Sequence, residues 1–162
     1  MTIELEPGGN LLNIKLKPIS PKLEDLDLSV FKTVNNSLKV LHPDEKERVL
    51  GALNFLYDAL AVPTYVQSYI SIYRALSYLM DSIGCQGNSR DTAAETFKKF
   101  RCNGVLTEEQ EASLTGRFEK IHSMEHHVAE GKKVKIEELD KIKEFFKEFL
   151  IQYIEYTKMV HK

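Results

Sequence analysis

Apolar residues recur every three or four positions along most of this chain, a spacing typical of α-helices with one buried face. The first such segment covers residues 28–41, where Val30, Val34, Leu38 and Leu41 share a face. Similar patterns predict helices within residues 45–62, 63–84, 90–101, 107–130 and 136–159. The chain is therefore predicted to be all-α, an up-and-down bundle of five to six helices.

Residues that start or stop helices lie where these segments begin and end. Pro43 opens the second helix, because proline is tolerated in a first turn, and Pro63 ends it. Gly84 is placed to act as a C-terminal glycine stop for the third helix. Thr107 and Gln110 have the spacing of a capping box, which predicts that a helix begins at Thr107.

The first residues follow a different pattern, because apolar and polar residues alternate on both sides of the stretch Pro7–Asn10. The proline and glycines of that stretch favour a tight turn, so the pattern predicts a short N-terminal β-hairpin. Pro18 and Pro21 then mark a connector. The predicted organisation is an N-terminal β-hairpin arm and linker over residues 1–20 and a helical bundle over residues 21–162.

The last predicted helix has an unusually broad apolar face. Its apolar positions are Leu139, Ile142, Phe145, Phe146, Phe149, Leu150, Tyr153 and Ile154. One neighbouring helix rarely covers so broad a face, so the pattern predicts an additional partner helix or a homodimer. A tyrosine ridge on the third helix favours the border of a core over a base-stacking surface; it consists of Tyr65, Tyr69 and Tyr73.

The composition is that of one globular domain of 162 residues, with 43% hydrophobic and 28% charged residues. The net charge of −2 supplies no global positive field, which argues against a broad nucleic-acid binder but leaves small basic patches at Lys98–Arg101 and Lys132–Lys135. Two cysteines make neither a disulfide framework nor a cysteine metal knuckle. Because no signal-peptide pattern and no apolar run of roughly 18 residues occurs, we expect a cytoplasmic protein without a membrane partner.

The candidate chemistry is concentrated between Thr115 and Lys133, a stretch that holds three of the five histidines. On a helical wheel, His122 lies on one shoulder of the inward face and Arg117 lies on the other. Glu125 falls near the middle of that face, where a carboxylate must be paired, protonated or freed by an early helix end.

A first interpretation is a zinc site, because His122-x-x-Glu125-His126 fits the H-x-x-E-H pattern of inverzincin metallopeptidases. Histidines four residues apart on a helix can both reach one zinc ion. A catalytic zinc needs a third ligand, however, and no downstream acid stands out for that role. This interpretation is the least favoured, and we expect neither a metal nor another cofactor.

A second interpretation is metal-free acid–base chemistry on RNA. The imidazole of His122 can move a proton to or from a ribose 2′-hydroxyl, while the guanidinium of Arg117 holds the phosphate. One such pair makes a thin active site, so two copies meeting in a dimer would favour the reaction. In a third interpretation these side chains only face water, and Arg117 pairs with Glu109 or Glu119.

The spacing of Arg117, four residues and then His122 resembles the signature of the HEPN superfamily of helical-bundle domains. The resemblance covers roughly Pro43 to Tyr156, through paired central helices with the stretch "YRALSYL", the motif helix, a glycine turn and a closing helix. It implies a metal-independent endoribonuclease, often a toxin or defence effector, that acts as a dimer with composite sites. Arg117 would then bind the scissile phosphate and His122 would be the acid–base residue. In another register His126 takes the motif position, and Lys120 stands where arginine is expected.

We therefore expect a HEPN-like domain, and the sequence leaves open whether it is an enzyme that cleaves RNA without a metal. The catalytic candidates are Arg117, His122 and His126, and the binding candidates are Lys120, Glu125 and His127. The alternative is a non-catalytic interaction module of the same architecture, which would bind RNA, a nucleotide or a partner protein such as a nucleotidyltransferase or an antitoxin. A zinc-dependent hydrolase is the third alternative.

Overall fold

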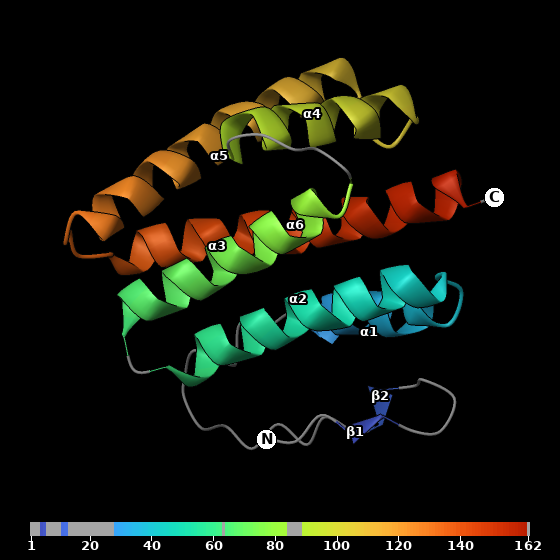
Figure 1. The fold of residues 1–162 in the computed structure, drawn as a ribbon, viewed down its shortest axis with the longest axis horizontal. Coiled ribbons are helices and arrows are strands. Elements are labelled where there is room, and N and C mark those ends of the chain that lie inside the picture. Colours follow the sequence, from blue (N-terminus) through green and yellow to red (C-terminus); the bar gives the residue numbers. More distant parts are fainter. Residues whose placement is uncertain (1–3, 6–10, 13–27, 63, 84–88, 162) are drawn as a thin grey trace.

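The computed structural model describes residues 4–5, 11–12, 28–62, 64–83 and 89–161. Figure 1 shows the six helices that these residues form: α1 (Leu28–Leu38), α2 (Pro43–Ala61), α3 (Tyr65–Asp81), α4 (Ser89–Cys102), α5 (Glu108–Ala129) and α6 (Ile136–Val160). The prediction of an all-α domain with five to six helices is thus confirmed. None of the described helices combines the length and the apolar composition needed to cross a membrane.

Two short strands, β1 (Glu4–Leu5) and β2 (Leu11–Leu12), pair in antiparallel register. The predicted turn at residues 7–10 and the connector that follows β2 lie outside the described residues. The hairpin arm as a unit, and the domain boundary at residue 20, therefore stay predictions.

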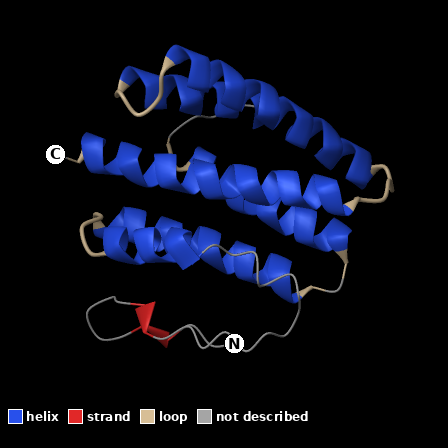
Figure 2. Cartoon of the chain, turned by 180° about the vertical axis from the view of Figure 1, so that it is seen from behind, coloured by secondary structure: helices blue, strands red, loops and turns tan. Residues whose placement is uncertain are grey.

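The helices form three layers, which Figure 1 and Figure 2 show from opposite sides. The central layer contains α3 and α6. On one side it is covered by α1 and α2, and on the other by α4 and α5. The helix with the candidate site, α5, is thus an outer helix with one side against the centre of the bundle.

Local sequence signals set the start of two helices as predicted. α2 begins at Pro43 and has Asp44 and Glu45 in its first turn. α5 begins after Thr107, whose Oγ1 accepts a hydrogen bond from the N–H of Gln110 (3.2 Å), while the N–H of Thr107 donates to Oε1 of Gln110 (2.8 Å). These two bonds are the predicted capping box.

A glycine ends α5. Gly131 has a φ of 88°, which L-residues with side chains rarely adopt. Its N–H donates to the carbonyl of Val128, and the N–H of Lys132 donates to the carbonyl of His127 (both 3.0 Å). This pair of bonds is a Schellman motif, and it turns the chain toward α6. The predicted helix stops at Pro63 and Gly84 lie outside the described residues.

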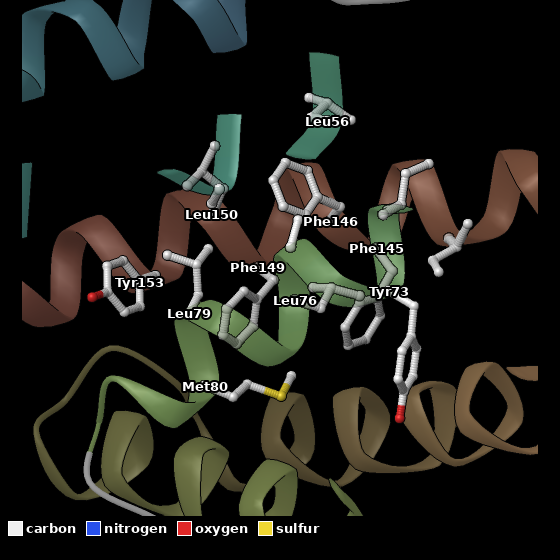
Figure 3. Close-up of a cluster of buried hydrophobic side chains, with 14 of the residues drawn as sticks. Leu56, Tyr73, Leu76, Leu79, Met80, Phe145, Phe146, Phe149, Leu150 and Tyr153 are labelled. Atoms are coloured by element: carbon white, nitrogen blue, oxygen red, sulfur yellow. The ribbon is translucent and has the colours of Figure 1, made fainter. Parts of the chain in front are cut away.

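The broad apolar face of α6 is buried within the single chain. All eight of its predicted apolar positions are at most 1% exposed. Figure 3 shows why, because α3 contributes Leu76, Leu79 and Met80 to the same cluster and α2 contributes Leu56. As a central helix, α6 has neighbours on several sides. The breadth of its face is therefore no argument for a second copy, and the predicted homodimer loses that support.

Candidate functional site

All six candidate site residues lie on α5, but the structure distributes them over two surfaces. One surface carries His122, Glu125 and His126, which we call the histidine cluster, and contacts α3 through His122. The other surface faces α6. It is a cavity that we call the α5–α6 groove, and its lining includes Arg117, Lys120 and His127. These two surfaces have different chemistry.

The histidine cluster is compact because its members occupy positions i, i+3 and i+4 of one helix. Nε2 of His122 and Nε2 of His126 are 3.1 Å apart. A carboxylate oxygen of Glu125 lies within 4.8 Å of a ring nitrogen of each histidine. His126 is exposed, whereas His122 and Glu125 are half-buried. The carboxylate that the wheel placed on the inward face therefore lies beside two imidazoles.

Tyr73 of α3 orients the ring of His122. Its hydroxyl is 2.7 Å from Nδ1 of His122, and either group can be the donor. Tyr73 is only 8% exposed, so its position is set by the core. The ring of Phe118 stacks near both, with centroids 6.2 Å from Tyr73 and 6.3 Å from His122. Because Nδ1 is engaged by Tyr73, Nε2 is the nitrogen that His122 presents to His126.

The electrostatic surroundings favour a neutral His122. Burial lowers the pKa of its imidazole below the ordinary value, and electrostatic interactions with His126 and Arg90 lower it further, while Glu125 acts in the opposite direction. Burial likewise raises the pKa of Tyr73. Arg90, at the start of α4, belongs to these surroundings although nothing in the sequence singled it out.

The α5–α6 groove has a volume of about 800 Å³. Its floor is apolar and consists of Tyr69 from α3 with Ile121 and Met124 from α5. The hydroxyl of Tyr69 donates to the carbonyl of Ile121 (2.9 Å), which ties the floor to the central layer. Arg117 and Lys120 stand on the α5 wall, and the acidic side chains on the α6 wall are Glu138, Asp140 and Glu144. Each wall also carries one charge of the opposite sign, Glu119 on the α5 wall and Lys141 on the α6 wall.

Arg117 and His122 make their contacts with different helices. Nη1 of Arg117 donates to Oε2 of Glu148 on α6 (2.5 Å), and its guanidinium lies over the ring of Phe145 at 5.2 Å from the centroid. His122 contacts Tyr73 and His126 instead. Arg117 and His122 were predicted to act as a pair, but among the described residues of one chain they contact different side chains and not each other. The pairing of Arg117 with Glu109 or Glu119 is replaced by one with Glu148.

The remaining candidates have separate surroundings. His127 lies at the end of α5, with Nδ1 3.4 Å from Glu130 and 3.1 Å from Nζ of Lys132. Lys120 is exposed on the rim of the α5–α6 groove.

No family model, curated protein or solved structure matches this chain. The resemblance to HEPN domains therefore rests on the sequence pattern, and the function has to be argued from the two surfaces of α5.

Proposed function

We propose that this chain is a non-catalytic interaction module of HEPN-like architecture, which receives an amphipathic helix of a partner protein in the α5–α6 groove. One observation carries the proposal: the groove combines an apolar floor with charged walls. Helix-in-groove recognition uses this arrangement, because apolar side chains of the incoming helix fill the floor and its charged flanks meet the walls.

The charges of the walls define the chemistry of the partner. The α5 wall carries the basic side chains of Arg117, which already pairs with Glu148, and Lys120, and the α6 wall is mainly acidic. The matching helix has acidic residues on one flank, basic residues on the other and an apolar stripe between them. Two of the acids already pair with lysines of α6, Asp140 with Lys143 (3.2 Å) and Glu144 with Lys147 (2.8 Å). Each charge contact with a partner is thus worth about 0.2–1 kcal/mol.

Two designed helical peptides with the same apolar stripe test the proposal by fluorescence anisotropy. The first has one acidic and one basic flank, and the second has two basic flanks. We expect the protein to bind the first peptide roughly 2- to 10-fold more tightly, since one flank changes from attraction to repulsion. Lys120→Glu makes the α5 wall acidic, so it should reverse this preference.

Two further variants test whether binding occurs at the floor. Met124→Glu places a charge there and should abolish binding of both peptides. Val40→Glu is the matched control, because Val40 is 69% exposed and does not line the groove. Equal affinity for both peptides, or unchanged binding by Met124→Glu, would contradict the proposal.

Metal-independent RNA cleavage is a second candidate, favoured by the half-buried His122 whose Nδ1 is held by Tyr73 and whose Nε2 meets His126. Such a site would require the guanidinium of Arg117 from a second copy. Incubation with labelled RNA, with and without EDTA, separates the two functions. Cleavage that survives EDTA and is lost in both His122→Ala and Arg117→Ala would replace the interaction module with a ribonuclease.

A further inference from the structure

We propose that the histidine cluster is a binding site for a divalent transition-metal ion, with Zn²⁺ as the first choice. His122, Glu125 and His126 are the ligands. This site lies on the surface of α5 that contacts α3 through His122, so it is separate from the α5–α6 groove and independent of the proposed interaction. It also differs from the sequence-based expectation of no metal, which rested on the lack of a third ligand in a distant segment.

The distance between the two imidazoles is close to what a metal requires. Zinc binds histidine nitrogens at about 2.0–2.1 Å in tetrahedral geometry, which places two such nitrogens about 3.4 Å apart. The observed separation of the two Nε2 atoms is 3.1 Å. A small rotation of the exposed His126 ring is enough to admit the ion.

Glu125 supplies the third ligand from the same turn of the helix. Its carboxylate oxygen lies within 4.8 Å of both ring nitrogens, so a modest change of rotamer brings it to a shared ion. Because all three ligands come from one helix, the backbone of the site is formed before the ion arrives. The carboxylate also offsets the positive charge of nearby Arg90, which acts on His122 and opposes a cation.

Tyr73 acts as the positioning residue. A metal-bound histidine usually donates a hydrogen bond from its other ring nitrogen to a fixed acceptor, and this bond orients the ring. The Tyr73 hydroxyl, 2.7 Å from Nδ1 of His122, is placed to accept it. Tyr73 is buried and stacks with Phe118, so the acceptor is held in place from the core side.

The ligand set selects the class of metal. Two imidazole nitrogens and one carboxylate suit zinc and other late first-row ions, whereas Mg²⁺ and Ca²⁺ prefer oxygen ligands. Three protein ligands leave at least one tetrahedral position free. His126 is exposed, so water can reach that position.

The test is metal binding by the full-length chain, purified without a histidine tag and stripped with a chelator that is then removed. Zn²⁺ is titrated by calorimetry, and Co²⁺ by its visible absorption. We expect one Zn²⁺ ion per chain and, with Co²⁺, the absorption of a tetrahedral cobalt site. A calorimetric titration with Mg²⁺ should show no binding. His126→Ala and Glu125→Ala each remove a ligand, so each should weaken binding by at least the ~100-fold that loss of a supporting group can cost.

Two further variants distinguish this site from a histidine-rich surface. His127→Ala removes the neighbouring histidine and should keep full affinity and the cobalt spectrum. Tyr73→Phe should weaken binding roughly 10- to 100-fold while the stoichiometry stays at one. Absence of binding at millimolar Zn²⁺, equal losses in His126→Ala and His127→Ala, or binding unchanged by His126→Ala would overturn the proposal. A failure of the peptide experiment would leave these outcomes unaffected.

Discussion

The hydroxyl of Tyr153 on α6 is expected to stabilise the fold through a buried carboxylate. Glu45 on α2 is 9% exposed, and its Oε2 accepts a hydrogen bond of 2.5 Å from this hydroxyl. Tyr153 has no measurable exposure, and its oxygen also lies 2.8 Å from Oγ of Ser82. Tyr153→Phe keeps the ring and removes only the oxygen, so it isolates the contribution of this bond.

The magnitude follows from what Glu45 retains. A hydrogen bond to a charged group contributes about 1.5–3 kcal/mol, and a carboxylate that loses its donor in the core also loses hydration. In Tyr153→Phe the carboxylate keeps Arg48 at 3.4 Å and His161 at 3.6 Å. The expected loss in the free energy of unfolding is therefore about 2 kcal/mol, a substantial part of a typical total of roughly 5–15 kcal/mol.

Urea unfolding followed by circular dichroism measures this loss. The matched control is Tyr156→Phe, on the same helix but half-exposed, for which we expect a change below about 0.5 kcal/mol. A double-mutant cycle of Tyr153→Phe with Glu45→Gln should give a coupling energy of about 1–2 kcal/mol. The reasoning is refuted if Tyr153→Phe costs no more than Tyr156→Phe, or if the two changes at residues 45 and 153 are additive.

Three other outcomes are expected for the stability of the fold. Burial and the hydrogen bond to Glu45 raise the pKa of Tyr153, so its stabilising contribution is complete below the unfolded value of about 10 and is lost as pH rises above it. In urea unfolding at alkaline pH, the free energy of unfolding should therefore fall less steeply with pH in Tyr153→Phe than in the wild type. Thr107→Ala removes the capping box of α5 and should lower the free energy of unfolding by about 1 kcal/mol in the same assay. Gly131→Ala should lower the free energy of unfolding by about 1–2 kcal/mol because of the positive φ. Gly116 lies inside α5, where an added Cβ meets nothing within 4 Å, so Gly116→Ala should raise the free energy of unfolding by up to about 1 kcal/mol. Thermal melts that show equal changes for both glycines would contradict this.

The extents of the helices could be predicted from the sequence because their signals are local. The apolar period, the proline at residue 43 and the capping box at Thr107 each act within a few residues of where they occur. The arrangement of the helices could not be predicted in this way. The broad face of α6 predicted either an additional partner helix or a second copy, and only the structure shows that other helices of the same chain cover it.

The same distinction applies to the candidate site. The approach of His122 to His126 follows from their spacing on one helix and was within reach of a helical wheel. The partners that decide the surroundings lie far away in sequence, since Tyr73 precedes His122 by 49 residues and Glu148 follows Arg117 by 31. A helical wheel places side chains on a face but does not identify the helix that packs against this face. It therefore could not show that Arg117 contacts α6 and His122 contacts α3.

Two tyrosines one turn apart on α3 hold consecutive residues of α5. Tyr69 donates to the carbonyl of Ile121 in the floor of the α5–α6 groove, and Tyr73 contacts the ring of His122. A sliding movement of α3 against α5 would thus disturb both surfaces at once. If an ion at one surface alters the affinity for a helix at the other, thermodynamic linkage requires the helix to alter the affinity for the ion by the same factor.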